Sequence, residues 1–203
     1  MFRQALTGFA SATLATAMLA SIVRGAGVEP SRADAASMVQ KVAAINALGE
    51  RPSQRLSRTV VTENELNAYL AYEAKDQLPV GLVEPAITIV GSGRVSARAV
   101  LDLDAVKKQR GNGGLLDAAS YLTGRVPIAA TGLLRTSDGV GRFELESATV
   151  GALPIPKTFL QEIVSQYSRT QANPAGIGLD APFALPSRIR EIQVEAGRAT
   201  IVQ

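Results

Sequence analysis

Three Gly-Arg steps, which begin at Gly93, Gly141 and Gly197, constrain the fold of this chain more than any other feature. Each step follows a turn-forming stretch and opens a run in which apolar and polar residues alternate, a period typical of β-strands. Glycine supplies the positive φ that tight turns require. The repeat therefore predicts three β-hairpins. The three stretches read ITIVGSGRVSARAV (87–100), LLRTSDGVGRFEL (133–145) and IREIQVEAGRATIV (189–202).

The first stretch also has the outline of a dinucleotide-binding turn, because Gly91-Ser92-Gly93 is followed by the small residues Ser96 and Ala97. Such a turn requires a helix after the glycines and an acidic residue at the end of the next strand. A helix would scatter the apolar residues that follow Gly93, whereas a strand places them on one face. That face consists of Val95, Ala97, Ala99, Leu101 and Leu103. We therefore interpret the glycines as a hairpin turn and predict no nucleotide cofactor.

Two helices are predicted before the first hairpin. Apolar residues at helical spacing indicate an amphipathic helix over about 35–48, and a short strand follows at 58–61. A capping box formed by Thr62 and Glu65 begins the second helix, which we expect to reach about Gln77.

Further helices are predicted between the hairpins. A short one is expected within 115–122, and a longer one follows Pro156. The longer helix carries a wide apolar stripe made of Phe159, Leu160, Ile163, Val164 and Tyr167. Together the elements predict an α+β fold, in which an antiparallel sheet of six or seven strands packs one face against three or four helices.

The N-terminus is typical of an exported protein. Arg3 precedes an uncharged, Ala- and Leu-rich run over residues 4–23. Such a run is typical of a secretory signal peptide or of an uncleaved signal anchor, and a buried N-terminal helix is the remaining alternative. We predict a signal segment at 1–26, a linker with the amphipathic helix at 27–57, and one α+β domain at 58–203. The domain is expected to be periplasmic or otherwise extracytoplasmic.

Composition excludes several functions. The chain has no Cys and no His, so thiol chemistry, Ser-His-Asp catalysis and His-ligated zinc are excluded. Arg3 and Arg24 contribute two of the three net positive charges, which leaves the remainder close to neutral. A nearly neutral domain with scattered basic residues lacks the electrostatic footprint of a nucleic-acid-binding protein.

Paired carboxylates are the remaining candidates for catalysis. Asp102 and Asp104 are expected on the same face of one strand, as are Glu144 and Glu146 on another. Both pairs fall on the predicted polar face or at a strand end, where ordinary solvation is expected rather than acid–base chemistry. We therefore predict no catalytic residue, metal site or cofactor.

Residues 58–203 resemble the LmeA-like phospholipid-binding proteins of the bacterial envelope, which are related to half of a tubular lipid-binding (TULIP-type) module. The resemblance implies a strongly curved antiparallel sheet around a long helix, with a lipid-sized apolar groove between them. The phrases that carry it are TVVTENELNAYLAYEA, GRVSARAVLDLDAV, GLLRTSDGVGRFELESATVGALPIPKTFLQEIV and PFALPSRIREIQVEAGRATIVQ.

The predicted inward faces of the sheet carry unusually small residues, namely Ala97, Ala99, Ala129, Ala130 and Gly132. Sheet and helices could pack closely over them, or the sheet could curl around an apolar cavity that a ligand fills. Candidate lipid-lining residues are Leu66, Tyr69, Leu70, Val95, Ala97, Ala99, Leu101, Phe143, Leu145, Leu153, Ile155, Phe159 and Ile163.

The expected function is that of an exported, non-enzymatic lipid-binding protein, with phospholipid or another membrane lipid and the membrane surface as partners. The glycine-rich segment 111–124 is a candidate lid over an acyl or isoprenoid chain. The alternative is a structural or adaptor domain, tethered to the membrane by residues 4–23, that binds another envelope protein.

Overall fold

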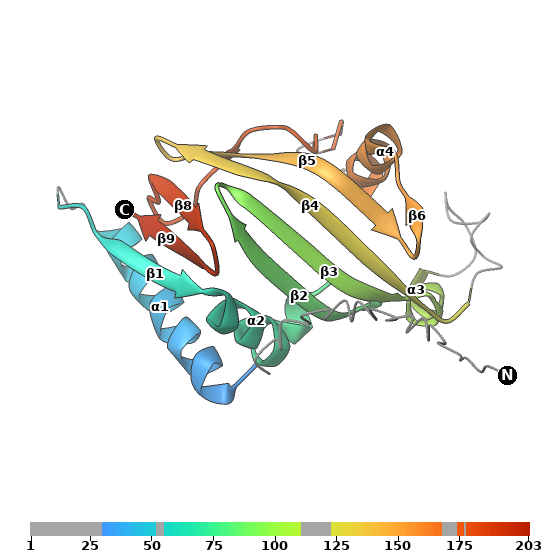
Figure 1. The fold of residues 1–203 in the computed structure, drawn as a ribbon, viewed down its shortest axis with the longest axis horizontal. Coiled ribbons are helices and arrows are strands. Elements are labelled where there is room, and N and C mark those ends of the chain that lie inside the picture. Colours follow the sequence, from blue (N-terminus) through green and yellow to red (C-terminus); the bar gives the residue numbers. More distant parts are fainter. Residues whose placement is uncertain (1–29, 52–54, 111–122, 168–173, 177) are drawn as a thin grey trace, which may run out of the picture.

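A computed structural model describes residues 30–51, 55–110, 123–167, 174–176 and 178–203 (Figure 1). Its helices are α1 (Arg32–Glu50), α2 (Glu63–Tyr72), α3 (Leu103–Arg110) and α4 (Lys157–Tyr167), with a short 3-10 helix at Lys75–Gln77. Its strands are β1 (Arg58–Thr62), β2 (Leu82–Gly91), β3 (Arg94–Asp102), β4 (Arg125–Ser137), β5 (Val140–Val150), β6 (Leu153–Pro154), β7 (Phe183–Ala184), β8 (Glu191–Glu195) and β9 (Arg198–Val202). The predicted α+β class is confirmed.

The strands form two antiparallel sheets, and neither closes on itself within the described residues. The large sheet has six strands, ordered β2-β3-β4-β5-β6 with β7 paired to β5. The small sheet has the order β1-β9-β8. This differs from the single predicted sheet, because the third hairpin pairs with β1 and not with the other two hairpins. The two sheets lie side by side in Figure 1. Strong curvature stays a prediction.

All three predicted hairpins are present as β2–β3, β4–β5 and β8–β9. In the first turn Gly91, Ser92 and Gly93 all have positive φ, at 106°, 52° and 80°. β3 follows at once, so the helix that a dinucleotide-binding turn requires is absent at this place. The hairpin interpretation of these glycines is confirmed.

The predicted helices α1, α2 and α4 are confirmed, with two differences. α2 ends at Tyr72, and the predicted stretch to Gln77 continues as the 3-10 helix. α3 was not predicted; it begins where the Asp102 side chain accepts a hydrogen bond from the Ala105 N–H at 2.9 Å. The predicted helix within 115–122 and the N-terminal segment 1–26 lie outside the described residues. No described helix has the length and apolar character needed to span a membrane.

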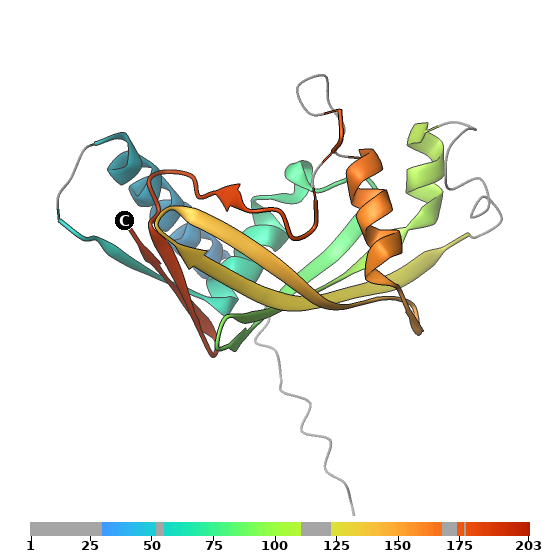
Figure 2. The same cartoon turned by 90° about the horizontal axis from the view of Figure 1, so that it is seen from above.

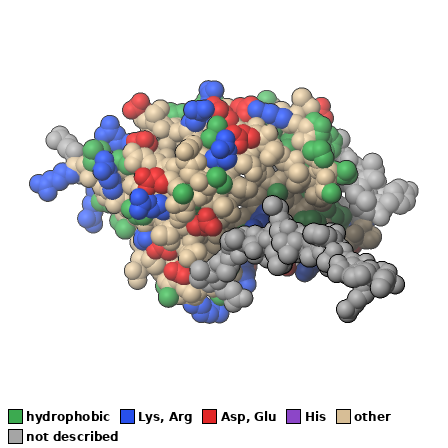
Figure 3. Space-filling view, viewed as in Figure 1, with side chains coloured by type: hydrophobic (Ala, Val, Ile, Leu, Met, Phe, Trp, Pro, Cys, Tyr) green, Lys and Arg blue, Asp and Glu red, His purple; other side chains and the backbone are tan. Residues whose placement is uncertain are grey.

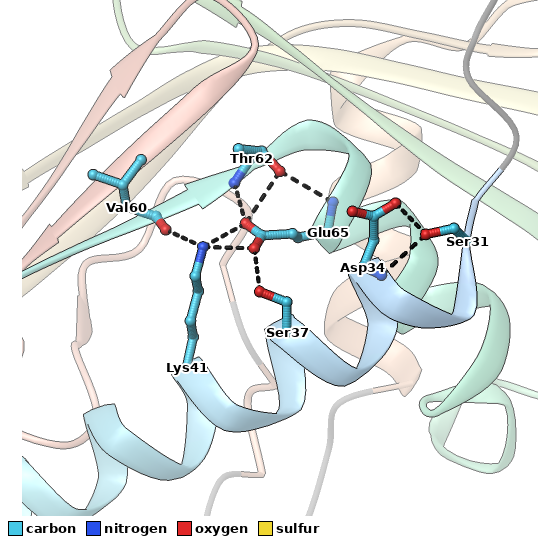
Figure 4. Close-up of polar contacts among 7 residues, drawn as sticks. All are labelled: Ser31, Asp34, Ser37, Lys41, Val60, Thr62 and Glu65. Atoms are coloured by element: carbon cyan, nitrogen blue, oxygen red, sulfur yellow. Dashed lines mark hydrogen bonds and ion pairs between the residues drawn. The ribbon is translucent and has the colours of Figure 1, made fainter.

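Most of the buried apolar residues lie where α1 and α2 meet the small sheet. They include Ala35, Met38, Ile45, Val61, Ala68, Val194 and Val202. Glu65 is buried among them, with 7% of its surface exposed. Its carboxylate accepts hydrogen bonds from Lys41 Nζ at 2.6 and 2.7 Å, Ser37 Oγ at 2.6 Å and the Thr62 N–H at 2.9 Å (Figure 4). The predicted capping box of Thr62 and Glu65 is therefore present and also joins α2 to α1.

The helices α2, α3 and α4 all stand on the same side of the large sheet (Figure 2). The opposite side carries ion pairs between neighbouring strands, such as Arg94–Glu146 at 2.8 Å and Arg135–Glu144 at 3.1 Å. Acidic and basic side chains stand next to one another on that side in Figure 3. The large sheet is therefore two-faced, with a solvated polar side and an apolar side toward the helices.

Candidate functional site

The strand register gathers small and apolar residues on the helix side of the large sheet. Directly paired residues of antiparallel strands point to the same side, so one row of partners identifies the others. Ala97 pairs with Ala130, which pairs with Ala148, and this row of three alanines crosses the middle of the sheet. The expectation that Ala129 also faces the helices is wrong, because it pairs with Arg98 and neighbouring residues of a strand point to opposite sides. We call the set the apolar face; it consists of Val95, Ala97, Ala99, Leu101, Val126, Ile128, Ala130, Gly132, Leu134, Phe143, Leu145, Ala148 and Val150.

The apolar face is only partly covered by the described residues. Ala99 is buried, Ala97 and Val150 are exposed, and most of the others are half-buried. α2 contacts β2, α3 contacts β4, and α4 contacts β5. The alanine row between these contacts leaves space on the sheet, because a methyl group projects little from the backbone.

One large side chain fills part of this space. A Cβ at Gly132 would lie 2.5 Å from the Phe143 ring and 2.6 Å from the Glu144 carbonyl oxygen. The Phe143 ring therefore lies over Gly132 and occupies the place that a side chain at that position would take. A similar arrangement recurs at Gly141, where the Phe183 ring lies over the glycine.

An apolar pocket of about 670 Å³ opens at the end of the apolar face, where α2 and the 3-10 helix meet the start of β2. It is continuous with that face through Leu82, which pairs with Leu101. Lys75 and Glu84 are its charged residues. The other lining residues are Pro30, Leu70, Ala71, Tyr72, Leu78, Leu82, Val83 and Pro85. A volume of this size falls in the range of small-molecule sites.

Polar side chains of α2 hold the helix against β2 beside this pocket. The Asn67 amide donates to the Ile87 carbonyl at 2.8 Å and accepts from the Ile87 N–H at 2.7 Å. The Glu63 carboxylate accepts from the Ile89 N–H at 2.8 Å. These bonds satisfy backbone groups of the edge strand β2 and fix the helix that carries Leu70.

The structure brings together most of the predicted lipid-lining residues. Those on β3 and β5 all lie on the apolar face, and Leu70 lines the pocket. Leu66 and Tyr69 are half-buried on α2, and Ile155 is half-buried beyond β6. Leu153 and Phe159 are mostly solvent-exposed, at 70% and 50%. Ile163 lies in α4, but its side chain is outside the described part of the structure.

Several pocket residues could not be identified from the sequence. Three of them, Leu78, Leu82 and Val83, belong to the segment LPVGLVEP (78–85). The apolar residues of this segment follow neither helical nor strand spacing. Asn67 was also missed, since a polar residue on a helix is usually solvated and only the position of β2 reveals its partner.

The candidate carboxylate pairs serve structural roles. The expectation that Asp104 shares a strand face with Asp102 is wrong, because β3 ends at Asp102 and Asp104 lies in the first turn of α3. Asp104 accepts a hydrogen bond from the Gly124 N–H at 3.2 Å. Glu146 receives two hydrogen bonds from the Arg94 guanidinium, which hold the pKa of this carboxyl below its usual value. Among the described residues no three acidic side chains gather in a way that could hold a metal ion.

Comparison with known proteins finds no matching family model, no similar curated protein and no similar solved structure.

Proposed function

We propose that this protein is an exported, non-enzymatic lipid-binding protein of the bacterial envelope, which holds an acyl or isoprenoid chain against the apolar face. The observation that carries the proposal is the continuity between the partly covered apolar face and the apolar pocket of about 670 Å³ at Leu82. The alanine row of Ala97, Ala130 and Ala148 gives a chain room to lie across the sheet.

The energetics favour an extended hydrocarbon as the ligand. Each methylene removed from water contributes about 0.8 kcal/mol, so a chain of ten buried methylenes would gain about 8 kcal/mol before the cost of ordering it. Such a ligand needs an apolar wall and the exclusion of water, and it needs no specific hydrogen-bonding groups. The half-buried residues of the apolar face meet this requirement.

Native mass spectrometry of protein purified under gentle conditions, together with extraction of labelled phospholipid from vesicles, tests the proposal. Ala97→Trp places an indole on the exposed centre of the apolar face and should lower extraction several-fold. Ala129→Trp is the matched control, because Ala129 is also exposed on the large sheet but pairs with Arg98 on the opposite side. Equal extraction by both variants, or a wild-type protein without lipid, would overturn the proposal.

The second candidate function is a membrane-tethered adaptor that binds another envelope protein. The exposure of Leu153 and Phe159 favours it, since large apolar side chains on a surface often mark a contact site. An adaptor would remain ligand-free in the same experiment, and its wild type would extract no phospholipid.

A further inference from the structure

Four arginines surround a small cavity at the end of the molecule where α1 finishes. The cavity has a volume of about 220 Å³. Arg51 follows α1, Arg55 precedes β1, and Arg188 and Arg190 precede β8. The other described lining residues are Leu48, Ser57 and Gln203, so none of the described side chains around the cavity is acidic. Lys and Arg side chains gather at this end of the molecule in Figure 3.

The three segments that supply the arginines are tied together by Gln203. Its amide donates to the Ile45 carbonyl at 2.8 Å and to the Ser187 carbonyl at 2.7 Å. Its backbone exchanges two hydrogen bonds of 3.0 Å with Ser57. The end of α1, the start of β1 and the loop before β8 are therefore fixed relative to one another, although they lie far apart in the sequence.

The turn that carries Arg188 has an unfavourable backbone. Ser187 and Arg188 have φ values of 51° and 56°, and the Ile189 N–H donates to the Pro186 carbonyl at 3.0 Å. Positive φ at both central positions is typical of a type I′ turn, which favours Gly or Asn. Here a serine and an arginine occupy these positions, although glycine would fit with less strain.

Contacts with α1 hold this turn in place. The Ser187 hydroxyl donates to the Asn46 side-chain oxygen at 2.7 Å. A Cβ at Gly49 would lie 2.6 Å from the Ser187 backbone, so the turn packs directly on the helix at a glycine. Strained residues that the surroundings hold in place are common at binding sites.

Three arginines of this cluster, Arg51, Arg188 and Arg190, differ in their charge partners from three arginines elsewhere in the molecule. Arg94, Arg135 and Arg198 each pair with a glutamate. Within the described ranges, no carboxylate lies within ion-pair distance of Arg51, Arg188 or Arg190 (all solvent-exposed). The neighbouring cavity of about 350 Å³ differs, because Asp138 and Glu191 line it together with Arg58 and Arg190.

We propose that the cavity bounded by Arg51, Arg55, Arg188 and Arg190 binds a phosphate group. Arginines that line one cavity repel each other, and a bound anion would relieve this repulsion; the planar fork of a guanidinium also matches the oxygens of a phosphate. The phosphate could belong to a soluble phosphate ester or to the headgroup of a membrane lipid. This inference does not rest on the proposed function, because the cluster lies apart from the apolar face.

Titration of the full protein with inorganic phosphate at constant ionic strength, followed by calorimetry, tests the site. The informative variant is Arg188→Gly, which removes a guanidinium and relieves a positive φ. We expect roughly tenfold weaker phosphate binding, as for the loss of a charge-assisted hydrogen bond, with an unchanged or higher Tm. Arg51→Gln should weaken binding similarly. Arg142→Gln, an exposed arginine on β5, is the charge-matched control and should bind as the wild type does.

Sedimentation with vesicles distinguishes the two sources of phosphate. Binding to vesicles that contain phosphatidylglycerol, competed by inorganic phosphate and lost in Arg188→Gly, supports the site with a lipid headgroup as its ligand. Phosphate binding without vesicle binding supports it with a soluble ester. Absence of phosphate binding in the wild type would overturn the proposal, as would equal losses in Arg188→Gly and Arg142→Gln, which indicate attraction by overall charge alone.

Discussion

The two ends of this molecule differ in how deeply their apolar residues are buried. Where α1 and α2 meet the small sheet, Met38, Ile45 and Val61 are buried and Glu65 is enclosed by hydrogen bonds. On the large sheet, the apolar face is half-buried, and Ala97 is exposed. The first region has the features of a core that stabilises the fold, and the second has those of a partly open apolar surface.

We infer that the first region mainly stabilises the fold and that the second is the better candidate for ligand binding. A closed region can tolerate a buried ionic network, because every member has a partner. A partly covered apolar face stabilises the fold less than a closed core does. It would, however, offer a hydrocarbon ligand an apolar surface away from water. Changes in the first region should therefore affect the free energy of unfolding, and changes in the second should affect ligand uptake.

The largest expected effect is a loss of stability in acid that depends on Glu65. Burial alone raises the pKa of this carboxyl, but hydrogen bonds from Lys41, Ser37 and Thr62 outweigh it and lower the pKa from 4.5 to about 2. A lowered pKa in the folded state stabilises the protein above the unfolded value, and this stabilisation disappears as the pH falls from about 5 to about 2. It amounts to about 3 kcal/mol.

Denaturant unfolding of the wild type and Glu65→Gln at pH 7 and pH 3 measures this effect. The variant should be less stable at pH 7. The difference in free energy of unfolding between the two proteins should be smaller at pH 3, because protonation of Glu65 in the unfolded wild type removes most of the stabilisation that its lowered pKa provides. A difference that stays constant across this pH range would show that the carboxylate's charge does not stabilise the closed region.

Removal of the cation from the same network should have a somewhat smaller effect. Lys41→Ala deletes the bond to Glu65 and the 2.7 Å hydrogen bond to the Val60 carbonyl. We expect a loss of about 2 kcal/mol, between the values for exposed and for buried ion pairs, since Lys41 is partly solvated. The control is Arg94→Gln, which breaks the more exposed pair with Glu146 on the large sheet and should change stability much less, because water and salt screen an exposed ion pair. Equal losses in the free energy of unfolding for the two variants, measured in urea, would contradict the view that the two regions differ in their contribution to stability.

Most helices and strands could be predicted from the sequence because their signals are local. The alternation after Gly93, the turn glycines and the capping box of Thr62 and Glu65 depend on residues only a few positions apart. It did not predict that β9 pairs with β1, because that pairing joins Arg58 to Val202 across the length of the chain. Alternation identifies a strand but does not identify its neighbour.

The candidate site shows the same limit. The apolar residues of β3 and β5 could be assigned to one face, since a period of two determines sides within each strand. The lining of the pocket could not be assigned, because Leu78 and Leu82 are brought beside Leu70 by the path of an irregular segment. The arginine cavity was likewise missed, since Arg51 and Arg188 are scattered in the sequence and become neighbours only in the fold.

A pair of substitutions on β3 separates packed from open parts of the apolar face. Ala99 is 9% exposed, so Ala99→Trp should overpack its surroundings and lower the free energy of unfolding by about 1–2 kcal/mol. Ala97 is exposed two residues away, so Ala97→Trp should change stability by less than about 0.5 kcal/mol. Urea unfolding of both variants checks the pair. A large loss in Ala97→Trp would indicate that this part of the face is packed core.

The smallest effect on stability is expected at the far end of the large sheet. Leu153 and Phe159 are mostly exposed, so the double variant Leu153→Ser and Phe159→Ser should change the free energy of unfolding by no more than about 0.5 kcal/mol. If this end contacts the membrane during lipid uptake, the variant should extract phospholipid from vesicles several-fold more slowly, because the insertion of two apolar side chains is lost. The matched control is Val140→Ser, which removes another exposed apolar side chain, at the opposite end of β5. Slower extraction in both variants would mean that exposed apolar area in general, and not this end of the sheet, governs contact with the bilayer.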